Sequence, residues 1–108
     1  MADEQWVELL KVADCPPGRR KFIEMGDREL TVFHLDDPDR FVVIDNSCPH
    51  AGGNLSAGEI EDGCVVVCPW HLWTFNLDNG ACTLNEQITL QRYPSKVEGD
   101  ALLALLKD

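Results

Sequence analysis

Basic side chains are scarce in this sequence. Nineteen acidic residues stand against nine lysines and arginines, so the 108-residue chain carries a formal net charge of −10. Phosphate backbones and anionic membranes repel such a protein, which argues against nucleic acid and membrane surfaces as partners. The charge fits two interpretations: general solubility, or an acidic face that steers docking onto a basic partner protein.

Long apolar segments are also missing. No run approaches the roughly 18 apolar residues that a membrane-spanning helix needs. Residues 1–6 are acidic where a secretion signal would be basic, and no apolar segment follows them. We therefore expect a cytoplasmic location, where the five cysteines are more typical of metal binding than of a disulfide framework.

The common nucleotide-binding motifs do not occur. Neither G-x-G-x-x-G nor G-x-x-x-x-G-K-[ST] is present, so nothing supports binding of nicotinamide, flavin or nucleotides through those loops. Histidine is rare as well, with only His34, His50 and His71. A non-haem iron oxygenase site needs two histidines and a carboxylate around one metal. If His50 and His71 serve elsewhere, that site cannot form, and we expect the chain itself not to be an enzyme.

No long stretch has the period of a helix. Instead, short β-rich segments separated by turn residues lie at 6–12, 21–25, 29–35, 41–44, 64–67, 74–77, 90–93, 96–97 and 101–106. The last run is rich in alanine and leucine, but six residues after a turn at 98–100 are short for a helix, so we expect a strand. These segments predict an all-β fold, a small antiparallel barrel or sandwich that forms one domain over residues 1–108.

The most informative stretch runs from Cys48 to His71. It begins with C-P-H and ends with C-P-W-H, and seventeen residues separate the two Cys/His pairs. Each pair follows a predicted strand, and the neighbouring prolines and glycines favour irregular backbone. We therefore expect two ligand-bearing loops, at about residues 46–54 and 66–76.

Two kinds of metal site suit the four candidate ligands Cys48, His50, Cys68 and His71. One is a structural zinc ion in a tetrahedral Cys₂His₂ set, which would make the chain a zinc-stabilised interaction module. The other is a [2Fe-2S] cluster with two cysteines on one iron and two histidines on the other. A familiar zinc finger pairs cysteine with cysteine and histidine with histidine. Here each loop supplies one of each, which favours a cluster whose two irons are reached from both loops.

This pattern of two loops, C-x-H and C-x-x-H, resembles that of the Rieske iron-sulfur proteins. The resemblance implies one [2Fe-2S] cluster per chain, with Cys48 and Cys68 on one iron and His50 and His71 on the other, in a two-loop cluster-binding subdomain. The sequence is most similar to the small ferredoxins of bacterial ring-hydroxylating dioxygenases and to the small subunit of NADH-dependent nitrite reductases.

The same resemblance implies a function and partners. A ferredoxin of this kind is a one-electron carrier, a component of a multicomponent oxidoreductase system, and is expected to be a monomer when isolated. Its expected partners are a flavin-containing reductase and a terminal oxygenase. The alternative is a small subunit that associates with the large subunit of a nitrite reductase.

Four positions near the ligands imply a low reduction potential. Respiratory-chain Rieske proteins carry a disulfide across the cluster where this chain has Gly53 and Trp70, and they offer serine and tyrosine hydroxyls to the cluster where it has Trp73 and Phe75. Fewer hydrogen bonds to the cluster sulfurs stabilise the reduced state less. We therefore predict a potential near the bottom of the Rieske range, on the order of −150 mV. The two tryptophans are expected to cover the cluster.

The three remaining cysteines have no role that the resemblance assigns: Cys15, Cys64 and Cys82. Cys64 alternates with Val66 on a predicted strand, which indicates a buried thiol. His34 also lies in a predicted strand and is expected to be structural. Gly58, like the glycines of the first loop, is expected to supply turn geometry.

Overall fold

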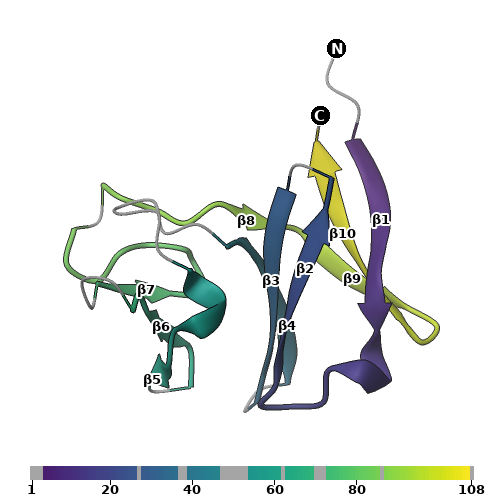
Figure 1. Cartoon of the computed structure of the whole chain (residues 1–108), viewed down its shortest axis with the longest axis horizontal. Coiled ribbons are helices and arrows are strands. Elements are labelled where there is room, and N and C mark those ends of the chain that lie inside the picture. Colours follow the sequence, from purple (N-terminus) through teal and green to yellow (C-terminus); the bar gives the residue numbers. More distant parts are fainter. Residues whose placement is uncertain are drawn as a thin grey trace.

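Three antiparallel sheets make up this computed structural model, which describes residues 4–26, 28–36, 39–46, 54–61, 63–69, 73–85 and 87–107 (Figure 1). The terminal sheet has the order β1-β10-β9 and consists of β1 (Glu4–Lys11), β9 (Ser95–Glu98) and β10 (Ala101–Lys107). The central sheet has the order β2-β3-β4-β8 and consists of β2 (Arg20–Met25), β3 (Arg28–Leu35), β4 (Arg40–Asp45) and β8 (Arg92–Tyr93). The distal sheet consists of β5 (Ile60–Glu61), β6 (Val65–Val67) and β7 (Thr74–Asn76).

The predicted all-β class is confirmed. The only helical segments among the described residues are two single 3₁₀ turns, η1 (Val12–Asp14) and η2 (Leu55–Ala57). None of the described segments is a helix long and apolar enough to cross a membrane. The alanine- and leucine-rich run near the C-terminus is a strand, as predicted, because β10 pairs with β1 from Glu4↔Lys107 to Lys11↔Ala101.

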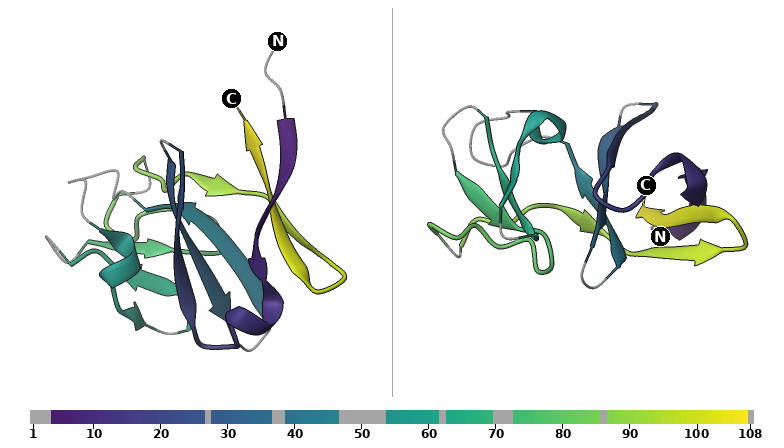
Figure 2. Two further views of the ribbon diagram at one scale, coloured as in Figure 1. Left: turned by 45° about the vertical axis from the view of Figure 1, so that its right-hand side comes forward. Right: turned by 90° about the horizontal axis from the view of Figure 1, so that it is seen from below.

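The central sheet is covered on both faces, which gives the domain three layers (Figure 2). Side chains alternate along β3, so Leu30 and Val32 pack toward the terminal sheet, whereas Phe33 and Leu35 pack toward the distal sheet. This two-sided cover explains why every residue from Leu30 to Leu35 is buried. The core on the terminal side contains Leu10, Cys15, Leu30, Val32, Val43, Leu102, Ala104 and Leu106. The distal core contains Phe33, Leu35, Val42, Ile44, Leu55, Val66, Cys68, Phe75, Leu77, Cys82 and Leu90.

His34 is structural, as the sequence predicted. Its ring is buried and stacks on Phe41 with 4.0 Å between ring centroids. Nδ1 lies 2.6 Å from the carbonyl oxygen of Cys15, and Nε2 contacts the carboxylate of Asp39. The side chain therefore ties the segment after β1 to the turn between β3 and β4.

Two groups in the fold make its stability sensitive to alkaline pH. Burial raises the pKa of the Cys15 thiol, and burial together with the negative charge of Asp45 raises the pKa of the Tyr93 phenol. In the unfolded chain both groups lose their protons at a lower pH than in the folded one, so the stability they contribute is lost as pH rises.

We therefore expect the free energy of unfolding to fall above about pH 8.5, the usual pKa of a free thiol. Urea denaturation at a series of pH values measures this change. The variant Cys15→Ser cannot ionise there and should lose less stability than the wild type over the same range. Parallel curves for the two proteins would contradict the assignment to Cys15.

Candidate metal centre

The second ligand loop is closed at its base by the distal sheet. β6 and β7 pair through Val67↔Thr74, and the next residue on each side, Cys68 and Trp73, is joined by a 2.7 Å hydrogen bond from the Cys68 N–H to the Trp73 carbonyl. The strands thus occupy both ends of the predicted loop region, and the connection itself spans residues 68–73. Cys68 lies directly after a strand, as predicted.

Cys68 is the candidate ligand that the structure describes. Its thiol is free, and the residue is fully buried in the distal core with Phe75. A buried, apolar position limits the access of water to whatever the sulfur binds. The other three candidates, Cys48, His50 and His71, lie outside the described residues, as do Gly53 and Trp70.

The first ligand loop is also closed at its base. β4 ends at Asp45, and the carbonyl of the following Asn46 accepts a 2.9 Å hydrogen bond from the N–H of Leu55, the first residue of η2. The two residues that flank the segment 47–54 are therefore held together. Cys48 and His50 fall within that segment of the sequence.

Gly58 brings the two loop bases together, and the sequence-based interpretation of this residue was wrong. Its backbone is extended, with φ −77° and ψ 151°, so it does not supply a glycine-specific turn. A Cβ there would collide with the carbonyl oxygen of Val67, and the Val67 N–H bonds the carbonyl of neighbouring Glu59 at 2.9 Å. Glycine is needed because the exit of the first loop runs against β6, the strand that leads to Cys68.

Two arginines of the central sheet bind the segments next to the ligand loops, one at the exit of the first loop and one in the turn after β7. The guanidinium of Arg20 on β2 donates to the carbonyls of Ser56, at 3.2 Å, and Gly58, and lies over the Phe33 ring, 5.1 Å from its centroid. Burial lowers the pKa of Arg20. On the other side, Arg40 of β4 binds both carboxylate oxygens of Asp78, at 2.7 and 3.0 Å. The hydrogen bond to Asp78 raises the pKa of Arg40.

A third loop accompanies the second ligand loop. The N–H of Thr83 donates to the carbonyl of Thr74 at 2.8 Å, and the hydroxyls of the two threonines contact each other. Leu84 follows Thr83 on this loop, and 65% of its surface is exposed. Trp73 is half-buried against the distal core.

The remaining cysteines differ in burial. Cys15 and Cys82 are buried free thiols in the two cores. Cys64 is only partly buried, because it lies in the turn before β6, which begins one residue later than predicted. The prediction of a buried thiol at this position is therefore wrong, although Cys64 still packs against the distal core.

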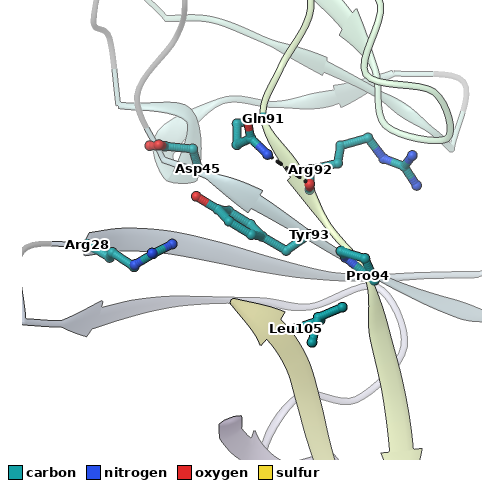
Figure 3. Close-up of a pocket in the computed structure, with 7 residues that line it drawn as sticks. All are labelled: Arg28, Asp45, Gln91, Arg92, Tyr93, Pro94 and Leu105. Atoms are coloured by element: carbon teal, nitrogen blue, oxygen red, sulfur yellow. Dashed lines mark hydrogen bonds between the residues drawn. The ribbon is translucent and has the colours of Figure 1, made fainter. Parts of the chain in front are cut away.

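A cleft of about 620 Å³ lies beside β8 and is bordered by residues of β3, β4 and β10 (Figure 3). It is lined by Arg28, Asp45, Gln91, Arg92, Tyr93, Pro94 and Leu105. The Arg28 guanidinium lies 5.9 Å from the Tyr93 ring centroid, and the Gln91 amide donates to the Arg92 carbonyl at 3.2 Å. Figure 3 shows the Arg92 side chain pointing away from Tyr93. The described residues of its lining include no cysteine or histidine, so we do not assign the metal centre to this cleft.

The donor set and its scaffold fit a [2Fe-2S] cluster. Two loops, each carrying one thiol and one imidazole in the sequence, are closed at bases that share the distal core through Leu55 and Cys68. Thiolate and imidazole are the ligands of the Rieske type of cluster. The protein thus offers one buried, hydrogen-bonded platform for both loops.

Comparison with known proteins establishes the family. Residues 5–94 match the model of the Rieske [2Fe-2S] domain, and the chain belongs to that family. A Rieske domain holds a single [2Fe-2S] cluster, which is therefore the cofactor of this chain.

Two curated relatives that match over most of their length are ferredoxins. The ferredoxin component of the alkene monooxygenase system of Xanthobacter autotrophicus is 29% identical over 101 residues, covering 94% of this chain and 81% of that protein. The methanesulfonate monooxygenase ferredoxin subunit of Methylosulfonomonas methylovora is 28% identical, with coverages of 95% and 82%. By contrast, the chain spans only 19% of the oxygenase component of 3-ketosteroid-9-alpha-monooxygenase from Rhodococcus rhodochrous, to which it is 37% identical over 78 residues.

Solved structures give the same fold. The ferredoxin of carbazole 1,9a-dioxygenase from Nocardioides aromaticivorans superimposes with a TM-score of 0.79 at 26% identity, over 92% of this chain and 95% of that one. A small subunit of NADH-dependent nitrite reductase from Mycobacterium tuberculosis superimposes with a TM-score of 0.80 at 23% identity, over 96% of both chains. The predicted Rieske-like fold is confirmed.

Proposed function

We propose that this chain is a one-electron carrier whose cluster is held by Cys48, His50, Cys68 and His71. The observation that carries the ligand assignment is the position of Cys68, buried at the end of β6 on a hydrogen-bonded loop base that adjoins the exit of the first loop. When bound, the cluster supplies reversible one-electron chemistry. The loop bases fix the spacing of the ligands, and the distal core keeps water from the Cys68 side.

The proposed partners are a flavin-containing reductase as donor and a terminal oxygenase as acceptor. Two relatives that are covered over most of their length are ferredoxins of monooxygenase systems, which supports a carrier rather than a catalytic subunit. The net charge of −10 suits docking onto basic surfaces of such partners. The alternative is a small subunit of an NADH-dependent nitrite reductase, and stable co-purification with a large subunit would favour it. Because the chain belongs to the Rieske family, we no longer interpret the four candidate ligands as the site of a zinc-stabilised interaction module.

The domain and its location are part of the proposal. The family match ends at residue 94, but β10 pairs with β1 along its whole length, so we propose one Rieske domain that includes this C-terminal strand. The four described cysteines are free thiols, as expected in a reducing compartment, which supports a cytoplasmic location.

Rapid mixing tests the carrier function directly. The purified protein should be bleached by a reductase with NADH and recover its colour on mixing with an oxidised terminal oxygenase. Iron and acid-labile sulfide analysis confirms that a [2Fe-2S] cluster is the absorbing group. A protein that holds the cluster but transforms substrate without any partner would contradict the proposal.

Leu84 provides a test of which part of the surface binds the oxygenase. Its exposed side chain lies on the loop bonded to β7, next to the second ligand loop, and burying it against a partner would stabilise the complex by about 1.5–3 kcal/mol. We expect Leu84→Ser to raise the Kd for the oxygenase by about tenfold or more, without changing the reduction potential. The matched control is Val97→Ser on the terminal sheet, because Val97 is also exposed, at 50%. Equal effects of the two substitutions would contradict docking through the Leu84 end.

A further inference from the structure

A buried amide joins the entrance of the first ligand loop to its exit. Asn46 follows β4 and is only 5% exposed. Its side-chain oxygen accepts two hydrogen bonds, one from the Thr31 hydroxyl at 2.8 Å and one from the Ser56 N–H at 2.9 Å. Thr31 is a fully buried residue of β3, and Ser56 belongs to η2 beyond the loop.

The backbone of the same residue makes the same connections. The Asn46 N–H donates to the Glu29 carbonyl on β3 at 2.8 Å, and the Asn46 carbonyl accepts from the Leu55 N–H at 2.9 Å. Four hydrogen bonds from one residue therefore link the central sheet, the start of the loop and η2. Burying an amide is costly unless its polar atoms are paired, so these hydrogen bonds favour the geometry in which all of them form.

We propose that Asn46 is the positioning residue of the first ligand loop, fixing the ends of the segment that carries Cys48 and His50. The proposal rests on the ligand assignment made above. The segment 47–54 is short, and its two ends are set by the bonds to Leu55 and Ser56. Groups that orient metal ligands affect the bound metal itself as well as the fold, because they fix ligand direction.

Asn54 separates this role from simple capping of η2. The Asn54 side-chain oxygen accepts from the same Ser56 N–H, at 3.1 Å, and from the Ser56 hydroxyl, at 2.6 Å. Asn54 is exposed, however, and its side-chain bonds stay within its own turn. If Asn46 only capped η2, loss of either side chain would have similar consequences.

The experiment compares three variants of the full-length, cluster-loaded protein: Asn46→Leu, Asn46→Asp and Asn54→Ala. Aspartate has nearly the volume of asparagine and keeps an oxygen that accepts from Thr31 and Ser56. Leucine has the same branching at Cγ but is larger and offers no acceptor. The measurements are the rate of cluster loss to an iron chelator and the electron paramagnetic resonance spectrum of the reduced protein. Neither measurement requires a partner or turnover.

We expect Asn46→Leu to lose its cluster about tenfold faster than the wild type and to show a shifted spectrum. The variants Asn46→Asp and Asn54→Ala should stay within about twofold of the wild-type rate. The proposal is overturned if Asn46→Leu behaves like the wild type, like Asn46→Asp or like Asn54→Ala.

If Asn46→Leu does not fold, Thr31→Val replaces it in the comparison. This variant removes one of the two donors while preserving the shape of the side chain, so cluster loss should accelerate about threefold. A wild-type rate in Thr31→Val would overturn the proposal. A wild-type protein that binds no [2Fe-2S] cluster would instead overturn the ligand assignment on which the proposal rests.

Discussion

Replacing Cys68 by alanine will remove nearly all iron and acid-labile sulfide from the protein, whereas replacing Cys82 by alanine will leave the cluster content unchanged. The two cysteines are closely matched, because both are free thiols buried in the distal core, with 0% and 1% of their surfaces exposed. They differ in position. Cys68 directly follows β6 at the base of the second ligand loop, whereas Cys82 lies beyond β7 and its backbone pairs with that of Phe75 in an isolated β-bridge. A soft thiolate ligand cannot be supplied by a methyl group.

The measurement is iron and sulfide content together with the visible absorption spectrum. Thermal unfolding of the two variants tests whether the fold survives, because each substitution leaves a similar small cavity in the same core. His71→Ala should match Cys68→Ala if the histidine completes the same site. A cluster-loaded Cys68→Ala protein, or equal cluster loss in Cys82→Ala, would contradict the ligand assignment.

Local sequence patterns predicted most of the strands because they are short and bounded by turns, and many are rich in β-branched or aromatic residues. The alanine- and leucine-rich β10 was predicted from its length and the preceding turn, and the two-residue β5 was missed. Such patterns could not predict that β3 packs against another layer on each of its two faces. Thr31 and His34 interrupt its apolar run, and their burial depends on partners far away in the sequence, namely Asn46, Cys15 and Asp39. Local alternation cannot supply those partners, so it cannot show that both faces of the strand are covered.

The candidate site was predictable in its ligands but not in its supports. The spacing of cysteine and histidine is a direct chemical signal, whereas Asn46 and Asn54 flank the first loop with the same side chain and are not distinguished by any local pattern. Only the fold separates the buried Asn46, whose side-chain oxygen bonds Thr31 and Ser56, from the exposed Asn54. The need for glycine at position 58 likewise comes from the approach of β6, not from the local turn.

Phe75 carries the second prediction, which concerns the reduction potential. This residue is fully buried in the distal core that also contains Cys68, at the position where respiratory-chain Rieske proteins have a tyrosine. A phenylalanine ring offers no hydrogen-bond donor, so the more negative reduced state is stabilised less. We expect redox titration of the wild type to give a potential on the order of −150 mV. A clearly positive value would contradict the low-potential assignment.

The variant Phe75→Tyr should raise that potential. A hydroxyl donating to a charged acceptor contributes about 1.5 kcal/mol, which corresponds to about 60 mV for a one-electron couple. The matched control is Phe33→Tyr, because Phe33 is 1% exposed in the same core but lies on β3, under Arg20. There the added hydroxyl should lower the free energy of unfolding and leave the potential unchanged. If both variants lose stability and neither shifts the potential, Phe75 does not face the cluster, and the low potential would need another physical cause.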